Sequence, residues 1–240
     1  MSNDTPQALP AQGGHAVVTG SSQGIGRAVA AHLLALGWRV TGLDAAPATL
    51  AHEAFQPVAI DLSDAAQVAA QLPHWQDCDA LVHAAGVLRV APLGALAPDA
   101  GALMWKLHVE AATALANGLL PAMAERGRGR FILIGSRVSQ GMPGRSQYAA
   151  TKAALVALAR SWAAEVIARQ VTVNVISPAA TQTAMLADPA RTGSAPRVPP
   201  LGRYIQPEEI AALAAFLLSP AAAAITGQDI AVCGGASLPR

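Results

Sequence analysis

The chain contains little charge, few aromatic residues and only two cysteines. Of its 240 residues, 13% are charged and 4% are aromatic, and the formal net charge is +1. No basic block and no mixture of basic and aromatic residues is present, which argues against nucleic acid as a partner. Cys78 and Cys233 are isolated and show no Cys-x-x-Cys spacing, so they indicate neither a disulfide framework nor a zinc site. We therefore expect a reducing, cytoplasmic location and no metal.

Long apolar runs and a targeting signal are also missing. Gly, Pro or charged residues interrupt each apolar run well short of a membrane span, so we expect no membrane contact. The first residues, MSNDTPQALPAQGG, have neither a positively charged start nor an apolar run, unlike a secretory signal. We expect residues 1–13 to be a flexible lead-in. Residues 14–240, with a 52% hydrophobic composition in the whole chain, should form one domain with a sizeable core.

Short β-branched runs alternate with stretches of helical periodicity. Strands are expected at residues 15–19, 39–43, 57–60, 80–83, 131–134, 171–176 and 229–232. Helices are expected at residues 27–36, 64–72, 104–123, 148–168 and 207–218, and a substrate lid rich in Pro, Gly and Ala around residues 184–203. The alternation predicts a single-domain α/β Rossmann fold, a doubly wound parallel sheet with helices on both faces.

A glycine-rich turn, TGSSQGIG, follows the first expected strand. Gly20, Gly24 and Gly26 let the backbone turn sharply and approach a pyrophosphate, and the following helix offers free N–H groups and its positive dipole end. The spacing is G-x-x-x-G-x-G instead of the commoner G-x-G-x-x-G, so an ordinary strand-to-helix turn is the alternative. Asp44 ends the second expected strand, where a carboxylate can bind both adenosine ribose hydroxyls and repel a 2′-phosphate. Unless Asp44 is only a capping residue, this favours NAD over NADP.

Other residues could contribute at the adenosine end. Arg27 and Arg39 are the nearest basic residues that could support NADP binding, but neither follows the second strand. Asp61 and Leu62 follow the third expected strand, where an adenine amino group could be held. This interpretation is weaker, because Asp is common at strand ends as a cap.

Tyr148 and Lys152 are four residues apart in QYAATK, on one face of an expected helix. A phenol has a reference pKa near ~10, and a neighbouring ammonium favours the phenolate and lowers that pKa. Ser136 comes twelve residues before Tyr148, just past the FILI strand, where its hydroxyl can orient a substrate oxygen. Ser139, in the same loop, is its rival. Together these residues predict hydride transfer coupled to proton transfer at a carbon–oxygen bond.

These motifs resemble those of the short-chain dehydrogenase/reductase family. The resemblance implies that Tyr148 is the catalytic acid/base, that Ser136 polarises the substrate oxygen, and that Lys152 positions the nicotinamide ribose and relays protons. It also implies a homotetramer built partly on the two long helices. The resemblance spans residues 15–235 and rests on TGSSQGIG, Asp44, Asp61-Leu62, AAG at 84–86, Ser136, YAATK, Asn174 before Ser177-Pro178, and Gly234-Gly235.

The same resemblance implies which residues contact the dinucleotide. Besides Tyr148 and Lys152, these are Gly20, Ser22, Gln23, Gly24, Ile25, Gly26, Asp44, Asp61, Leu62, His83, Ala84, Ala85, Gly86, Pro178, Thr181 and Thr183.

Within the family the chain most resembles the 2,3-dihydro-2,3-dihydroxybenzoate dehydrogenases of catechol siderophore biosynthesis. DAAQVA, DALVHAAGVLR, SPAATQTAM and the short segment after Asp44 carry this resemblance. It implies NAD-dependent oxidation of a cyclic diol acid to an aromatic ring. An acidic substrate needs a cation, and three arginines fall on loops expected to rim the pocket, although each is alternatively a solvated loop residue. The substrate-binding candidates are Arg89, Arg137 and Arg145, with Met142 and Met185 to pack on a flat ring unless they belong to lid or core.

Several positions depart from the family pattern. His83 stands in place of the first Asn of an NAAG-type motif, and His108 in place of the Asn that supports a proton-relay water. His108 could relay a proton itself or pack against the sheet, and His83 could hydrogen-bond to backbone near adenosine. Ala179 and Cys233 replace the usual Gly and Asp. Three functions stay open: a dehydrogenase of a cyclic diol or hydroxy acid, an oxidoreductase for another alcohol or ketone, and a non-catalytic dinucleotide-binding regulator.

Overall fold

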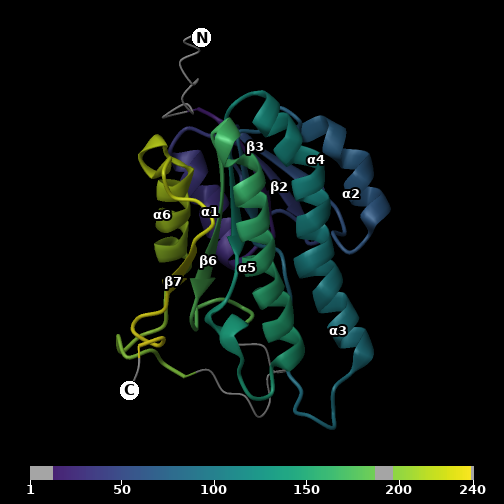
Figure 1. The fold of residues 1–240 in the computed structure, drawn as a ribbon, viewed down its shortest axis with the longest axis vertical. Helices are drawn as coiled ribbons and strands as arrows, with labels where there is room; N and C mark the ends of the chain where they lie inside the picture. The colour runs from purple at the N-terminus through teal and green to yellow at the C-terminus, as the bar shows by residue number, and fades with distance from the viewer. Residues whose placement is uncertain (1–12, 187–196, 239–240) are drawn as a thin grey trace.

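Seven parallel strands form one sheet in the order β3-β2-β1-β4-β5-β6-β7 in the computed structural model, which describes residues 13–186 and 197–238 (Figure 1). The strand order reverses between β1 and β4, and open α/β sheets bind ligands in the crevice beyond the strand ends at such a point. The predicted Rossmann fold is confirmed. The strands are β1 His15–Thr19, β2 Arg39–Asp44, β3 Phe55–Ala59, β4 Ala80–His83, β5 Gly129–Ile134, β6 Val171–Pro178 and β7 Asp229–Val232.

Helices cover both faces of the sheet (Figure 1). Alternate residues of each strand supply the two cores: Val17 and Phe131 pack toward α2, α4 and α5, and Val18 and Ile132 pack toward α1 and α6. This explains why the strands read as continuous apolar runs, since both faces are buried. The helices are α1 Gly24–Ala35, α2 Ala65–Gln71, α3 Pro98–Trp105, α4 Ala111–Glu125, α5 Ser146–Val166 and α6 Pro207–Leu218.

The third helix of the sequence prediction begins earlier and is less regular than expected. The sequence predicts it at residues 104–123, whereas α3 starts at Pro98 and is joined to α4 by a π-helical turn, Lys106–Glu110. Proline at the first helical position followed by Asp99 in the first turn is a favourable helix start. A π-turn inserts a residue into the helical ladder and is frequent at functional sites.

Strand β3 also starts two residues earlier than expected, at Phe55. Phe55 pairs with Val40, and Pro57 pairs with Gly42. Proline is tolerated here because β3 is an edge strand whose outer N–H side needs no partner.

The two flanks of the predicted lid are held together by backbone pairing. Thr181 and Ile205 form an isolated parallel bridge, the Gln182 N–H donates to the Ile205 carbonyl at 2.9 Å, and the Ile205 N–H donates to the Ala180 carbonyl at 3.0 Å. Residues 187–196 of the lid and 1–12 of the lead-in lie outside the described residues. Within the described ranges, no helix is long and apolar enough to cross a membrane.

Candidate active site

A cavity of about 1020 Å³ lies at the carboxyl ends of the central strands, and the three predicted catalytic residues all line it. Ser136 follows β5, whereas Tyr148 and Lys152 lie on the first turns of α5. All three side chains are buried in the protein, with Ser136 8%, Tyr148 9% and Lys152 5% exposed. Ser139, the rival of Ser136, does not line the cavity. The structure therefore brings Ser136, and not Ser139, together with Tyr148 and Lys152 in the cavity lining.

The Ser136 hydroxyl is fixed by the start of a short 3-10 helix, Arg137–Gln140. Its Oγ accepts a hydrogen bond from the Val138 N–H at 3.2 Å. That bond occupies a lone pair of Oγ and leaves the O–H to donate, which is what polarising a substrate oxygen requires. The local fold thus places a hydrogen-bond donor at the cavity wall.

Lys152 is held deep in the cavity wall by a backbone carbonyl. Its Nζ donates to the Ile134 carbonyl at 2.8 Å and lies 5.7 Å from the centroid of the Tyr148 ring. Burial lowers the pKa of Lys152 to about 7, because the charged ammonium loses most of its hydration there. An amine with this pKa can take up and release a proton near neutral pH, and it lies beside the Tyr148 phenol.

The predicted phosphate turn has the backbone geometry that a dinucleotide needs. Gly20 and Gly24 have positive φ angles of 68° and 55°, which side chains rarely adopt. A Cβ on Gly26 would collide with the Gly20 carbonyl oxygen. The turn runs into the N-terminus of α1, whose first N–H groups suit a pyrophosphate. These residues fit a bound dinucleotide.

Asp44 lies against this turn, at the carboxyl end of β2. Its Oδ2 accepts from the Ser22 N–H and its Oδ1 from the Ala46 N–H, both at 2.9 Å. A carboxylate has about four acceptor positions, so two backbone bonds leave capacity for ribose hydroxyls. Asp44 is half-buried, so it can both shape the turn and meet a ligand.

The two basic residues considered for NADP occupy different places. Arg39 is the first residue of β2, at the far end from Asp44, and pairs with Asp77 at 2.7 Å. Arg27 Nε donates to Thr49 Oγ1 at 3.1 Å, and that hydroxyl donates to the Ser22 carbonyl. Of these two cations, Arg27 is the one near the phosphate turn.

The remaining predicted cofactor residues divide into cavity-lining and other positions. Asp61 is exposed, and its Oδ1 accepts from both the N–H and the hydroxyl of Ser63, while the Leu62 side chain is buried in the core. Gln23 is exposed at the start of α1, and Ala85 packs against the core without lining the cavity. Those that line it are Ile25, Ala84, Gly86, Pro178, Thr181 and Thr183.

His83 does not face the cavity. The Thr19 hydroxyl accepts from the Ala84 and Ala85 N–H groups, which leaves its proton to donate to His83 Nδ1 at 3.1 Å. His83 Nε2–H then donates to the Leu107 carbonyl in the π-turn at 3.1 Å. Burial lowers the pKa of His83 to about 3, and the nearby charge of Lys152 adds to this effect. His83 therefore links β1 to the π-turn instead of presenting its ring to a ligand.

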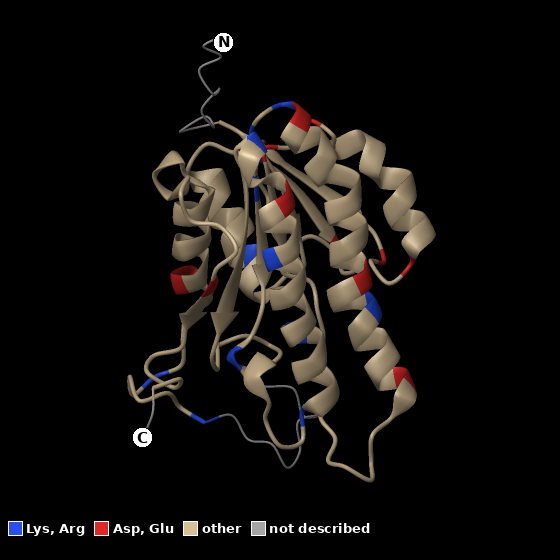
Figure 2. Ribbon diagram, viewed as in Figure 1, with Lys and Arg blue, Asp and Glu red and all other residues tan. Residues whose placement is uncertain are grey.

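Three arginines line the cavity among the residues that the structure describes. They are Arg137, Arg145 and Arg197, and none of the described lining residues is Asp or Glu. In Figure 2, the described part of the loop between β6 and α6 carries Lys or Arg residues. Arg89 lies elsewhere: it is exposed, outside the lining, and its Nη1 donates to the Leu88 carbonyl.

Met142 and Met185 both line the cavity, as the sequence suggested. Arg197 was missed, although a cation within a Pro-rich lid was a usable signal. Thr19 and Thr151, which hold the two histidines, gave no signal of their own, because their role depends on contacts distant in sequence. Within the described chain, no group of three or more His, Cys, Asp or Glu side chains could hold a metal ion.

Comparison with known proteins agrees with this geometry. The family model described as Enoyl-(Acyl carrier protein) reductase matches residues 20–237. A solved short chain dehydrogenase/reductase family protein is 34% identical, with a TM-score of 0.85, and the match covers 95% of this chain and 98% of that one. The chain belongs to the short-chain dehydrogenase/reductase family and is a dinucleotide-binding oxidoreductase of that family.

Individual relatives divide between two activities. The 3-oxoacyl-(acyl-carrier-protein) reductase FabG of Salmonella typhimurium is 34% identical over 242 residues, covering 93% of this chain and 97% of the relative. The 2,3-dihydro-2,3-dihydroxybenzoate dehydrogenase of Escherichia coli is 34% identical over 238 residues, covering 92% and 96%, but it is the weaker match. A 3-ketoacyl-(acyl-carrier-protein) reductase from Brucella melitensis, solved with NADH, is 26% identical with a TM-score of 0.86 and coverage of 95% and 99%.

Proposed function

We propose that this protein is an NAD-dependent dehydrogenase that oxidises a secondary alcohol of a small acidic substrate. The observation that carries the proposal is the meeting of Ser136, Tyr148 and Lys152 in one wall of a cavity next to the phosphate turn. A proton acceptor, a hydroxyl donor and a buried amine at one place are what oxidation of an alcohol to a carbonyl compound needs.

The roles of the three residues follow from their surroundings. NAD, when bound, supplies the hydride acceptor. Ser136 holds the substrate hydroxyl oxygen through its free O–H. Tyr148, as phenolate, takes the hydroxyl proton as the carbonyl forms, and the Lys152 ammonium stabilises that phenolate. The wall around them is buried, so bulk water does not weaken these interactions.

The preference for NAD rests on Asp44. Its carboxylate lies against the phosphate turn through Ser22 and would repel a 2′-phosphate. Arg27 is the nearby cation that opposes this preference, two hydrogen bonds away from Ser22. Since Arg27 is exposed, its charge is screened by water, and the half-buried Asp44 has the larger effect.

The acidic substrate is inferred from the cavity mouth. Arg137, Arg145 and Arg197 come from three separate segments, and all three line the cavity. A guanidinium in such a place suits a carboxylate, which it can bind through two parallel hydrogen bonds. Met142 and Met185 offer soft apolar surface for a flat ring. A cyclic dihydrodiol acid such as 2,3-dihydro-2,3-dihydroxybenzoate has the carboxylate and the flat ring that these residues suit. Oxidation of this substrate would give the protein a role in siderophore biosynthesis.

A second candidate is reduction of a 3-oxoacyl group, as the names of the FabG relatives suggest. The specific observation in its favour is the stronger match to those relatives across nearly the whole chain. In that case a reduced nicotinamide dinucleotide would supply a hydride to the carbonyl carbon, and Tyr148 would donate a proton to the carbonyl oxygen.

Turnover assays with purified protein separate the candidates. We expect NAD+ reduction with 2,3-dihydro-2,3-dihydroxybenzoate, and loss of activity by about 10²-fold or more in Tyr148→Phe. Ser139→Ala, in a residue outside the cavity, is the matched control for Ser136→Ala. Turnover of acetoacetyl-coenzyme A with no diol oxidation would favour the second candidate. Full activity in Tyr148→Phe would refute the mechanism for both, and no turnover with any alcohol or ketone would favour a regulator. The homotetramer expected for the family is checked by light scattering.

A further inference from the structure

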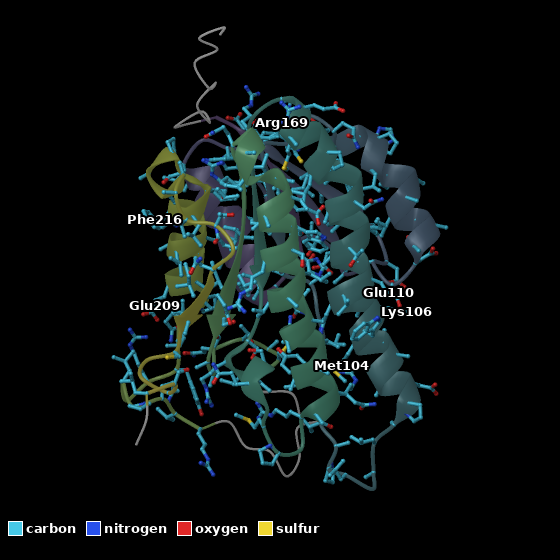
Figure 3. The ribbon with its side chains drawn as sticks, viewed as in Figure 1. Met104, Lys106, Glu110, Arg169, Glu209 and Phe216 are labelled. Atoms are coloured by element: carbon cyan, nitrogen blue, oxygen red, sulfur yellow. The ribbon has the colours of Figure 1, made fainter. Side chains whose placement is uncertain are left out.

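His108 lies at the centre of the π-turn between α3 and α4, with its side chain turned inward. Lys106 and Glu110 project from the outer side of the same turn (Figure 3), whereas the His108 side chain is fully buried and reaches the cavity wall. Gly86 makes room for it, since a Cβ there would lie 2.6 Å from His108 Nε2. The π-turn and this glycine together place an imidazole directly beside the catalytic residues.

Four groups form a hydrogen-bonded chain through this ring. The Val87 N–H donates to His108 Nε2 at 3.1 Å, His108 Nδ1 contacts Thr151 Oγ1 at 2.7 Å, and the Thr151 hydroxyl donates to the Tyr148 carbonyl at 2.8 Å. The two ends of this chain, the Val87 N–H and the Tyr148 carbonyl, determine where the protons lie between them, because a backbone N–H can only donate and a carbonyl can only accept. His108 Nδ1 must therefore carry the proton and donate it to Thr151.

The chain excludes one of the two roles considered for His108. A proton relay has to gain a proton at one ring nitrogen and lose it at another. Protonation at Nε2 would bring two N–H groups face to face and break the bond from Val87. Burial, Lys152 and His83 also hold the pKa of His108 well below its usual value.

We propose that His108 is a positioning residue that fixes Tyr148 for proton transfer. Its ring stands nearly perpendicular to the Tyr148 ring, at 87° with 5.6 Å between centroids, and Thr151 ties it to the Tyr148 backbone. The imidazole of His108 thus supports both the backbone and the ring of Tyr148, the proposed acid/base. Small displacements of a reacting group cost large factors in rate, so this support acts on catalysis. The inference rests on the proposed role of Tyr148.

The tautomer can be tested without any substrate. Long-range proton–nitrogen NMR spectra of histidine-labelled protein should show that His108 carries a proton on Nδ1 and does not titrate between about pH 6 and pH 9. His15 should give another Nδ1–H signal, because its Nδ1 faces the Asp77 carboxylate. Loss of one signal in His108→Asn and of the other in His15→Asn assigns the two. An Nε2–H tautomer, or a ring that titrates in this range, would overturn the inference even if the enzyme reaction has been assigned correctly.

Kinetics test the positioning role. An asparagine amide reaches the place of Nδ1 and can keep the bond to Thr151, whereas a glutamine amide reaches the place of Nε2 and keeps only the bond from Val87. We expect kcat to fall about tenfold or more in His108→Gln and in Thr151→Val, and less in His108→Asn and Thr151→Ser. The KM for NAD+ and the position of the kcat–pH profile should not move. A wild-type kcat in His108→Gln, or a shifted pH profile, would overturn the inference.

The control is a buried histidine far from the cavity whose two ring nitrogens are also hydrogen-bonded. His15 contacts Asp77 Oδ1 at 3.1 Å and Thr41 Oγ1 at 2.9 Å, at the amino end of β1. His15→Asn should lower the melting temperature and leave kcat unchanged, which separates lost stability from lost positioning. If Tyr148→Phe stays fully active, the proposed function fails, while the NMR result still decides the tautomer of His108.

Discussion

Replacing Lys152 by methionine should stabilise the cofactor-free protein most strongly at and below neutral pH. The native state holds this amine at a pKa of about 7, because it is buried. In the unfolded chain an ordinary lysine titrates near ~10.4. Between these values the unfolded chain binds a proton that the native protein lacks, so the free energy of unfolding of the wild type rises with pH. Methionine, of similar length and apolar, removes that dependence.

The magnitude follows from the width of this window. Each pH unit inside it changes the free energy of unfolding by about 1.4 kcal/mol, so two units above neutrality amount to roughly 2–3 kcal/mol. The advantage of Lys152→Met over the wild type should shrink by this amount between about pH 7 and pH 9. Loss of the bond from Nζ to the Ile134 carbonyl adds a cost that does not vary with pH.

Urea unfolding of both proteins across this pH range, at one protein concentration, measures the difference. Lys106→Met, in an exposed lysine of the π-turn, is the matched control and should show no such pH dependence. Parallel stability curves for Lys152→Met and the wild type would refute the inference that Lys152 titrates near neutrality. A melting experiment with saturating NAD+ added would then report cofactor binding separately.

Three further predictions concern the ligand site. Asp44→Ala should weaken NAD+ binding by about tenfold to a hundredfold, the loss of one or two charged hydrogen bonds, and weaken NADP+ binding less; an unchanged ratio of the two dissociation constants contradicts the assignment. Arg137→Met and Arg145→Met should raise the KM of an acidic substrate by about tenfold or more and leave that of a neutral alcohol alone, and equal effects on both would argue against an anion site. Gly26→Ala should abolish dinucleotide binding, measured by titration calorimetry, because its Cβ meets the Gly20 carbonyl.

The sequence predicted the sheet well because buried parallel strands leave a local signature. Runs such as VVT before Gly20 and FILI before Gly135 can pack on both faces only as central strands. The π-turn was not predictable in this way. Its sequence, KLHVE, has ordinary helical character, and the contacts that His108 makes from this turn reach Val87 and Thr151, which are distant in sequence.

The site was predictable where spacing along one element decides the geometry. Tyr148 and Lys152 share a helix, so four residues of separation sufficed to place both. The arginines depend on loop conformation, which the sequence does not specify. Arg89 was expected at the pocket and is exposed beside Leu88, whereas Arg197 was not singled out and lines the cavity. The sequence likewise left open whether His108 relays a proton or packs against the sheet, because its hydrogen-bond partners Val87 and Thr151 are known only from the structure.

The pairing of residues 180–182 with Ile205 has a consequence for how this fold can change its substrate. It brings the two ends of the intervening segment together between the end of β6 and the start of α6. Doubling the length of a closed loop costs only about 0.6 kcal/mol, so residues can be added or removed there with little effect on the rest. Met185 and Arg197, which lie within this loop, line the cavity, whereas Tyr148 and Lys152 belong to α5. Specificity can therefore be redesigned by exchanging one loop while the chemical machinery stays in place.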